Sequence, residues 1–397
     1  MQRRQFVAAG ASLLLGRLVR AAQLPRDLKV TRILGFDLPT QRSKLAGKNS
    51  QLEVHGDSSR DRMVRLFTNA GVEGLGNCRA DKEALAQLLG GNPFKGFDGA
   101  APRIGGPLGS QTMPLWDLAG KLLKRPVYDL LGGRGPERVP VYDGSIYFAD
   151  LLPQYADRWQ DRFKEEIDTG LRAGHRAFKI KVGRGAKWME RAAGDARDVE
   201  VVRLVRRHAG SEVLLGADAN NGYDLAGAKG FLDRAGGAGL LFVEELFPER
   251  VPDCLELKRL IASRGWKTLL ADGETQHDLE VFKPFIAAKA IDVLQADMNA
   301  FGVEGILREA EMARPEGILV GPHNWGSLVG FTMQLHVGRA IGNFFRAEHD
   351  PLASDVLVAE GYRIAGGRCS VPDAPGFGLA IHEANFARLK PRFDLRA

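Results

Sequence analysis

The most constraining feature of this sequence is an alternation of short apolar runs with amphipathic segments of helical period, which begins near residue 139. Such an alternation is typical of βα units that build a parallel sheet. We expect eight strands, at residues 139–147, 177–182, 213–219, 240–245, 268–271, 291–296, 317–320 and 344–347. The expected helices between them include residues 195–208, 225–234, 254–263 and 303–313. Eight strands at this spacing favour a closed (β/α)-barrel over an open sheet.

The residues before this alternation have a different pattern. Two short strands are expected at residues 29–38 and 63–69, a polar stretch at 41–59, and a helix at 113–131. The chain has 397 residues, more than the roughly 250–300 at which a single hydrophobic core stops growing. We therefore predict an α+β capping domain over residues 28–138, a barrel over 139–350, and a C-terminal segment, 351–397, that packs back on the capping domain.

The first 22 residues have the features of an export signal. They contain four arginines and no acidic residue, around an apolar core at residues 6–16. Arg3 and Arg4, followed by Gln5 and Phe6, resemble a twin-arginine signal, which is read by a transporter of already folded proteins. We expect residues 1–22 not to pack on the folded body and the protein to be exported to the periplasm. The alternative is a frayed basic N-terminus.

Charge and cysteine content exclude several classes of protein. The net charge of +6 comes from 55 Lys and Arg against 49 Asp and Glu. Without the four N-terminal arginines the excess falls to about 2, which makes a nucleic-acid partner a poor hypothesis. Outside the N-terminus, no apolar stretch approaches the roughly 18 residues that span a bilayer. Cys78, Cys254 and Cys369 have no metal-binding spacing, so we expect structural thiols and at most one disulfide.

Three acidic residues lie at the ends of consecutive expected strands. Asp218, Glu244 and Glu274 are separated by 26 and 30 residues, one βα unit each, so their carboxylates should converge at one end of the barrel. Converging carboxylates repel one another, and oxygen ligation favours Mg²⁺ over zinc as the compensating cation. Asp272 is a competing ligand if its strand continues to Glu274. The alternative is that each acid caps a helix or pairs with a local arginine.

Lys179 and Lys181 occur in a run of apolar residues, and the period of two places both on one strand face. We expect this face to be the barrel interior. Two lysines beside one another and beside a divalent cation disfavour each other's charge, which would lower the pKa of one toward the range of a general base. An exposed edge strand that carries charges against aggregation is the alternative.

Asp297 and His323 follow two further strands, 26 residues apart. Adjacent strand ends would let the carboxylate orient and charge-stabilise the imidazole, giving a second acid/base group. A satisfied structural histidine is the alternative. Glu348 lies 25 residues later, on the last strand.

Several of these motifs together resemble the enolase superfamily, in its mandelate racemase branch. The segments 115–121 and 126–133 are similar to the helix before the barrel, and Lys179-x-Lys181 to the base motif. Asp218, Glu244 and Glu274 are similar to the three metal-ligand motifs, with Asn220 beside the first. Asp297 and His323 resemble the His–Asp pair of this branch, and Glu348 its acid that contacts the substrate carboxylate.

The resemblance implies an N-terminal α+β capping domain, a (β/α)₇β-barrel, Mg²⁺, and abstraction of the proton α to a carboxylate to give an enediolate. Lys181 and His323 would supply a base and an acid from opposite faces, with Lys179, Asn220 and Glu348 binding the substrate. The polar stretch at 41–59 stands where a specificity lid is expected. Leu246 and Phe247 precede Pro248 where the family has proline directly after the acids, which affects loop shape rather than the ligand.

The sequence favours dehydration of a sugar acid, with a small carboxylate as substrate and a homo-oligomer as the assembly. Racemisation by 1,1-proton transfer and a non-catalytic sugar-acid-binding barrel are the alternatives.

Overall fold

The computed structural model describes residues 24–95, 97–98 and 103–397. Its central element is a parallel barrel, with the strand order β12-β11-β10-β9-β8-β7-β6-β13. An isolated parallel bridge between Val320 and Phe344 joins the two ends of this order. The eight strands are β6 (Arg138–Ile146), β7 (Ala177–Lys181), β8 (Leu214–Asp218), β9 (Leu240–Glu244), β10 (Leu269–Asp272), β11 (Val293–Leu294), β12 (Leu319–Val320) and β13 (Ala347–His349). The expected barrel is confirmed.

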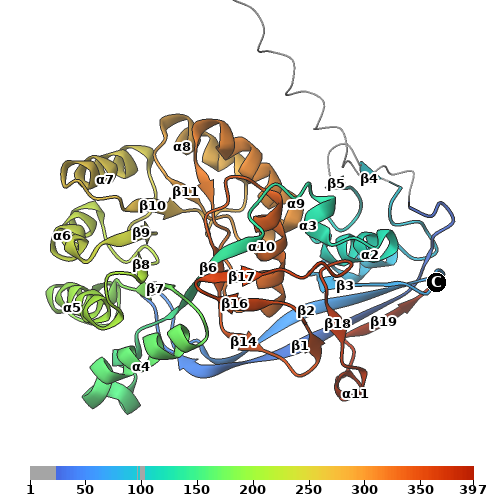
Figure 1. Ribbon diagram of the computed structural model, residues 1–397, viewed down its shortest axis with the longest axis horizontal. Helices are drawn as coiled ribbons and strands as arrows, with labels where there is room; N and C mark the ends of the chain where they lie inside the picture. Colours follow the sequence, from blue (N-terminus) through green and yellow to red (C-terminus); the bar gives the residue numbers. More distant parts are fainter. Residues whose placement is uncertain (1–23, 96, 99–102) are drawn as a thin grey trace, which may run out of the picture.

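Helices follow the first seven barrel strands and lie around the outside of the barrel (Figure 1). They are α4 (Trp159–Arg172), α5 (Arg191–Ala209), α6 (Leu225–Ala235), α7 (Val251–Ser263), α8 (Phe282–Ala288), α9 (Met298–Ala313) and α10 (Leu328–Ala340). The eighth strand, β13, is followed by β14 instead of a helix. The architecture is therefore (β/α)₇β.

Apolar side chains fill one end of the barrel interior and leave the other end to polar groups. Tyr142, Ala177, Phe242, Ala271 and Val293 form a cluster of buried residues there. Because side chains alternate along a strand, the inward position after Phe242 on β9 is Glu244, at the carboxyl end of the strand. The same alternation takes β7 from its inward alanine to two inward lysines. The site is thus confined to the carboxyl ends of the strands.

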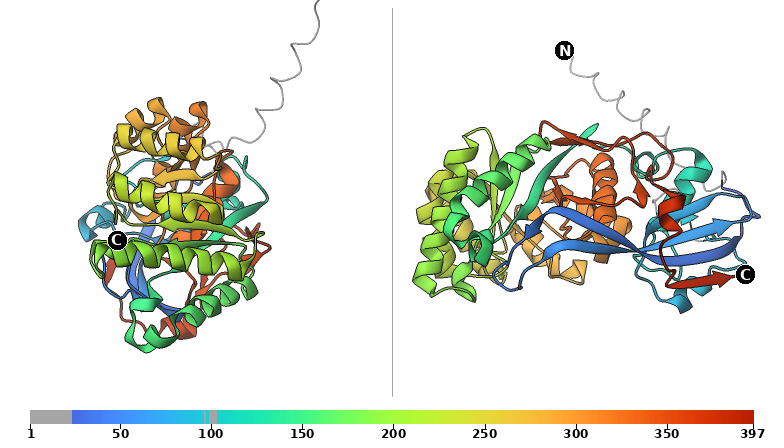
Figure 2. Two further views of the ribbon diagram at one scale, coloured as in Figure 1. Left: turned by 90° about the vertical axis from the view of Figure 1, so that its left-hand side faces the viewer. Right: turned by 90° about the horizontal axis from the view of Figure 1, so that it is seen from below.

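The preceding residues form an α+β domain beside the barrel (Figure 2). Its elements are β1 (Val30–Ala46), β2 (Gly56–Thr68), β3 (Glu73–Asn77), α1 (Lys82–Ala86), β4 (Phe97–Asp98), β5 (Arg103–Ile104), α2 (Met113–Leu123) and α3 (Val127–Leu130). β1, β2 and β3 form an antiparallel sheet. The two long strands β1 and β2 run from this domain to the barrel.

β1 and β2 are longer than the sequence predicts. Residues 41–46 and 56–59 of the expected polar stretch continue the two strands, and only residues 47–55 connect them. Polar side chains suit this part because it packs between the domains. Arg42, for example, is buried against Asp350 of the barrel with two hydrogen bonds of 2.8 and 2.6 Å.

The helix expected over residues 113–131 is interrupted, so that prediction was wrong in part. Lys124 closes α2 in the left-handed conformation, with φ at 53°. Pro126 follows and precedes α3, and proline disfavours a helical conformation in the residue before it. Periodicity alone could not reveal the break, because apolar spacing is similar on both sides of it.

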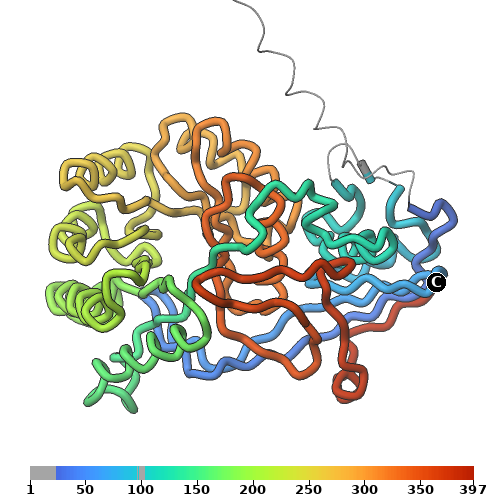
Figure 3. The backbone as a smooth tube through the Cα atoms, viewed as in Figure 1, coloured from blue at the N-terminus to red at the C-terminus, as the bar shows by residue number. Residues whose placement is uncertain are grey.

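The C-terminal segment contacts both domains, and its course is followed most easily in Figure 3. Its elements are β14 (Leu352–Ala353), β15 (Leu357–Val358), β16 (Arg363–Ala365), β17 (Arg368–Ser370), β18 (Ala380–Ile381), α11 (Glu383–Phe386) and β19 (Phe393–Arg396). β14 and β19 pair with β1, whereas β17 pairs with barrel strand β6. The predicted domain boundaries at 28, 138 and 350 stay predictions.

The remaining expectations concern thiols, membranes and the N-terminus. The three cysteines are free and buried. Within the described part of the chain, no helix has both the length and the hydropathy needed to cross a bilayer. The export signal predicted at residues 1–22 lies outside the described residues, so its packing stays a prediction.

Candidate active site

Three acidic side chains converge at the carboxyl ends of neighbouring strands. Asp218 ends β8 and pairs in register with Glu244, which ends β9. Glu274 lies two residues beyond β10. One carboxylate oxygen from each of the three lies within 4.8 Å of the others. The structure therefore brings together the acids that the sequence singled out as metal ligands.

Asp272, the competing acid, is not part of this group. β10 ends at Asp272, and Gly273 turns the chain with φ at 131°. The strand therefore ends before Glu274, although the sequence had allowed it to continue to that residue. Burial, with the nearby charge of Glu249, raises the pKa of Asp272 well above its ordinary value, which indicates a neutral carboxyl.

The two lysines of β7 are buried among these acids. The Lys179 ammonium lies 2.5 Å from Glu244, 2.7 Å from Glu348 and 3.0 Å from Asp218. Although burial by itself lowers the pKa of Lys179, the carboxylates of Glu244 and Glu348 raise it well above the ordinary value. The sequence predicts a lowered pKa for one of the two lysines, and at Lys179 the surrounding carboxylates outweigh the like charge of Lys181.

Lys181 has fewer acidic partners than Lys179. Its ammonium pairs with Asp218 and donates to Asn220 Oδ1 at 2.8 Å. Burial raises the pKa of Asp218, but the charges of both lysines outweigh it and hold the pKa below its ordinary value. Lys181 is thus placed at the edge of the acidic cluster, beside a polar amide.

His323 lies across the barrel from the lysines. Its Nδ1 is 2.7 Å from Asp297 Oδ2, and its Nε2 is 3.3 Å from Glu274 Oε2. Burial lowers the pKa of His323, but Glu274 and Asp297 with their neighbours raise it to about 10. A backbone bridge between Asp297 and His323 holds the two residues in register. The structure thus forms the expected His–Asp pair, with Nε2 directed to the acids.

Glu348 on β13 closes the ring of polar groups. Its Oε1 contacts Lys179, and its Oε2 accepts from the Asn324 backbone N–H at 3.0 Å and lies 4.0 Å from His323 Nε2. The residue is fully buried. Glu348 can therefore present a carboxyl oxygen between the lysine side and the histidine side of the site.

Two further polar residues, Gln295 and Glu245, support this arrangement and were not singled out from the sequence, whereas Asn220 was. Gln295 Nε2 donates to Glu244 Oε2 at 2.8 Å. Asn220 Nδ2 donates to Glu245 at 3.2 Å and to Glu274 at 3.3 Å. Asn220 and Glu245 both have φ at 42°, a strained conformation that is found at functional sites. The only sequence signal for Gln295 and Glu245 is that each lies close in sequence to an acid of the site. This closeness does not reveal which side chain each one contacts.

The connection between β1 and β2 covers this end of the barrel. Ser50 Oγ donates to the carbonyl oxygens of Ala219 and Asn220, at 2.5 and 3.0 Å. Trp188 Nε1 donates to the Asn49 carbonyl at 2.6 Å. The polar stretch that the sequence placed as a lid therefore contacts the loops that carry the site.

The acidic group has the properties of a divalent-cation site. Its donors are carboxylate oxygens, which Mg²⁺ prefers. Glu274 Oε2 is buried and, within the described residues, accepts no hydrogen bond, although His323 Nε2 lies 3.3 Å from it. Burial, together with Asp218, Glu348 and Glu274, raises the pKa of Glu244 to about 8 despite the charge of Lys179. The excess negative charge of the three carboxylates and an oxygen that accepts no hydrogen bond both fit a bound Mg²⁺.

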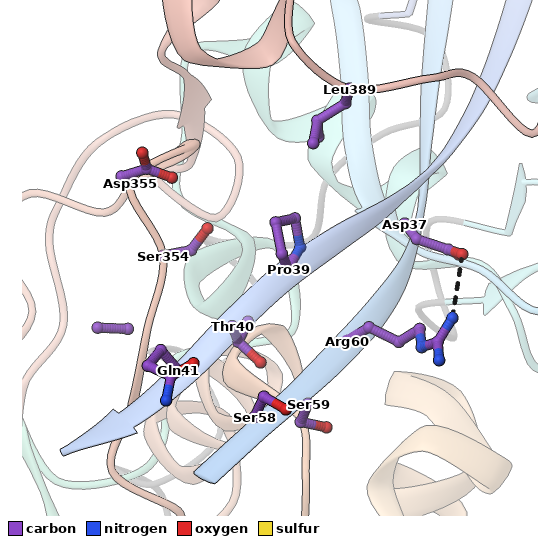
Figure 4. Close-up of a pocket in the computed structure, with 11 residues that line it drawn as sticks. Asp37, Pro39, Thr40, Gln41, Ser58, Ser59, Arg60, Ser354, Asp355 and Leu389 are labelled. Carbon is purple, nitrogen blue, oxygen red and sulfur yellow. Dashed lines mark ion pairs between the residues drawn. The ribbon is translucent and has the colours of Figure 1, made fainter.

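A separate groove, whose lining is drawn in Figure 4, contains none of these residues. It has a volume of about 1000 Å³ and runs between β1, β2 and the segment after β14. Residues such as Thr40, Ser58, Arg60 and Asp355 line it. None of the acids, lysines or histidines described above belongs to its lining. Catalytic chemistry is therefore assigned to the strand ends and not to this groove.

Comparison with known proteins agrees with this architecture. The family described as enolase C-terminal domain-like matches residues 162–385. Galacturonate dehydratase from Geobacillus sp., solved with D-galacturonate and 5-keto-4-deoxy-D-galacturonate, is 31% identical with a TM-score of 0.85, over 92% of this chain and 97% of that one. A mandelate racemase/muconate lactonizing protein from Geobacillus sp. Y412MC10, complexed with magnesium and tartrate, is 30% identical with a TM-score of 0.89, over 95% and 100%.

Arabinonate dehydratase of Saccharolobus solfataricus is 28% identical over 316 residues, which are 78% of this chain and 79% of that protein. The chain belongs to the enolase C-terminal domain-like family, as the family match over more than half of its length and the two solved structures show. The resemblance stated from the motifs is confirmed.

Proposed function

We propose that this protein is a Mg²⁺-dependent dehydratase of a sugar acid. The observation that carries the proposal is the placement of Lys181 and the His323–Asp297 pair on opposite sides of one acidic cluster. Lys181 ends β7 and His323 follows β12, and in the closed barrel four strands lie between β7 and β12 on one side and two on the other. The dehydratase names of relatives such as arabinonate dehydratase and galacturonate dehydratase support the same reaction.

Asp218, Glu244 and Glu274 would hold the Mg²⁺. When bound, the cation would neutralise the negative charge that develops on the substrate carboxylate. A relative complexed with magnesium supports this choice of cation. Lys179, 2.7 Å from Glu348, would bind the same carboxylate from the other side, and Glu348 in its protonated form would donate a hydrogen bond to it.

The reaction needs one base and one acid. As the free amine, Lys181 accepts the α-proton, and the electron pair of the broken C–H bond forms a C=C bond to the β-carbon. The β-hydroxyl leaves with a proton from His323 Nε2, so that water is released. The Asp297 carboxylate, 2.7 Å from Nδ1, stabilises the protonated imidazole that carries this proton. The enol product then tautomerises to a 2-keto-3-deoxy acid.

A screen of sugar acids for 2-keto product tests the proposal. With Mg²⁺ present, at least one acid should yield keto product and exchange its α-proton with deuterated solvent. Inversion of configuration without loss of water would instead establish a racemase. The absence of both exchange and product, with sugar acids still bound, would establish a binding protein and overturn the proposal.

We also propose export through the twin-arginine signal of residues 1–22. Arg3 and Arg4 with the apolar core that follows support it. In cell fractionation the wild-type protein should appear outside the cytoplasm, and a variant with Arg3→Lys and Arg4→Lys should stay inside. Equal export of both would contradict the proposal. A homo-oligomer is proposed as well, and light scattering after size exclusion measures it.

A further inference from the structure

His55 lies in the connection between β1 and β2, residues 47–55, which contacts the loops of the active site through Ser50 and Asn49. Figure 2 shows the two long strands that carry this connection to the barrel. A side chain of the capping domain is thereby placed at the end of the barrel where Lys181 and His323 lie.

His55 forms an aromatic wall with Tyr147 and Trp325. The rings of Tyr147 and Trp325 are stacked, with centroids 4.5 Å apart. His55 stands edge-on to both, at 4.7 Å from Tyr147 and 5.6 Å from Trp325. Tyr147 also lies 5.2 Å from the ammonium of Lys181. The same tyrosine ring therefore contacts His55 and the proposed base.

The position of the proton on His55 is fixed by Trp325. Trp325 Nε1 can only donate, and it donates to His55 Nδ1 at 3.0 Å. Nδ1 is thus the acceptor, and Nε2 carries the proton of the neutral ring. Burial, with the charges of Lys181 and Arg42, lowers the pKa of His55 to about 4. The ring is therefore neutral near pH 7.

The Nε2–H group of His55 lacks a partner in the described part of the chain, although the atom is buried. Leaving a buried donor unsatisfied destabilises the structure. A hydrogen-bond acceptor supplied by the substrate would remove this destabilisation. A neutral imidazole can donate to a hydroxyl oxygen, but it brings no positive charge that would compensate the burial of a second carboxylate.

The cations at this wall are already neutralised. Among the described residues, the Arg42 guanidinium lies over the ring of Trp325, and the Lys181 ammonium lies over the ring of Tyr147. Arg42 makes two hydrogen bonds to Asp350, and Lys181 pairs with Asp218. A second carboxylate of a substrate would meet no unpaired positive charge from them.

We propose that His55 Nε2 donates a hydrogen bond to a hydroxyl group of the sugar acid remote from its carboxylate, and that this wall selects hydroxylated monocarboxylates over dicarboxylates. The inference rests on the proposed function, since it assigns the substrate class of the same site.

Binding of matched acids tests the inference independently of turnover. D-galactonate and galactarate differ only at C6, where the first has a hydroxyl and the second a carboxylate, and D-gluconate and D-glucarate form a second such pair. With Mg²⁺ present, calorimetry on the wild type should give at least 10-fold tighter binding of one monocarboxylate than of its dicarboxylate.

Variants of His55 separate the hydrogen bond from the shape of the wall. His55→Phe keeps a ring without a donor and should weaken binding of the preferred monocarboxylate, and raise its KM, about 10-fold. The kcat for α-proton exchange should change less than threefold. His55→Gln keeps a donor near the Nε2 position and should stay within threefold of wild type. Trp325→Phe, which keeps the ring stack but frees the His55 tautomer, should give a smaller loss than His55→Phe.

Each outcome has one meaning. Unchanged binding in His55→Phe, or equal binding of mono- and dicarboxylates by the wild type, would overturn the inference. If the wild type still exchanged the α-proton, the proposed function would stand. The expected binding pattern without any exchange would overturn the proposed function and support the inference. Failure to bind any of the four acids would overturn the inference, whereas the proposed function would still be decided by the wider screen of sugar acids.

Discussion

At the residue scale, the two lysines of β7 share a strand face but differ in their surroundings. Lys179 lies between three carboxylates, whereas Lys181 pairs with Asp218 and an amide oxygen. Opposite charges favour the charged form of a group. Lys179 therefore suits a permanent cation that holds the substrate, and Lys181 suits the base.

Separate variants of Lys181 and His323 should affect different steps. Lys181→Met should remove exchange of the α-proton with deuterated solvent, because the base on that face is lost. His323→Asn should abolish formation of keto product but keep measurable exchange. Acid/base groups contribute roughly 10²–10⁴-fold to rates, so the losses are large enough to measure by NMR. Equal loss of exchange in both folded variants would contradict the two-face assignment.

The acids of the proposed metal site can be tested against a buried control. Asp218→Asn should weaken Mg²⁺ binding at least 100-fold in calorimetry, because a charged ligand becomes a neutral amide. Asp272→Asn should leave affinity within threefold, since Asp272 lies outside the converging group. Gln295→Leu, which removes the hydrogen bond to Glu244, should weaken binding about 10–100-fold. A comparable loss in Asp272→Asn would reassign the ligand.

At the element scale, the barrel strands were predictable because local spacing encodes them. Eight apolar runs gave eight strands, and the helices α5, α6, α7 and α9 lie where the amphipathic pattern placed them. The division of residues 113–131 into α2 and α3 was not predicted. Backbone conformation at Lys124 decides it, and the apolar period says nothing about a positive φ.

This break gives a stability prediction. Lys124 is exposed, with φ at 53°, and glycine adopts this conformation without the cost that a side chain adds. Lys124→Gly should raise the free energy of unfolding by about 1 kcal/mol. Lys164→Gly, inside α4, should lower it by about 1 kcal/mol. Urea denaturation measures both, and destabilisation by Lys124→Gly would disprove the strain at this turn.

At the scale of the whole molecule, buried polar contacts join parts that are distant in the chain. Asp61 of β2 accepts from the backbone N–H groups of Leu328 and Val329 at the start of α10, at 3.0 and 3.2 Å. Arg42 and Asp350 join the same two domains. These contacts hold the connection between β1 and β2 over the site.

His336 makes folding stability depend on pH. The Tyr128 N–H donates to its Nδ1, and Tyr362 lies 2.8 Å from Nε2. Burial, with the charge of Arg339, lowers its pKa to about 3. A depressed pKa in the folded state means that the unfolded chain binds the proton first. Stability should therefore be complete above about pH 6.5 and fall toward pH 3, by up to about 1.4 kcal/mol per pH unit.

Urea denaturation from pH 7 to pH 4 measures this effect. His336→Gln should be less stable at pH 7 but have a shallower dependence on pH than the wild type, because glutamine does not titrate. Parallel curves for the two proteins would show that His336 does not take up the proton.

The sequence by itself determined the barrel, the inward acids and lysines at its strand ends, and the His–Asp pair. These features follow from a period of two and from one βα unit per strand, both of which are local. Tertiary structure alone decided the raised pKa of Lys179, the exclusion of Asp272, and the contact of His55 with Trp325. Charge and hydrogen bonding depend on burial and on neighbours that are distant along the chain, and no local pattern contains them.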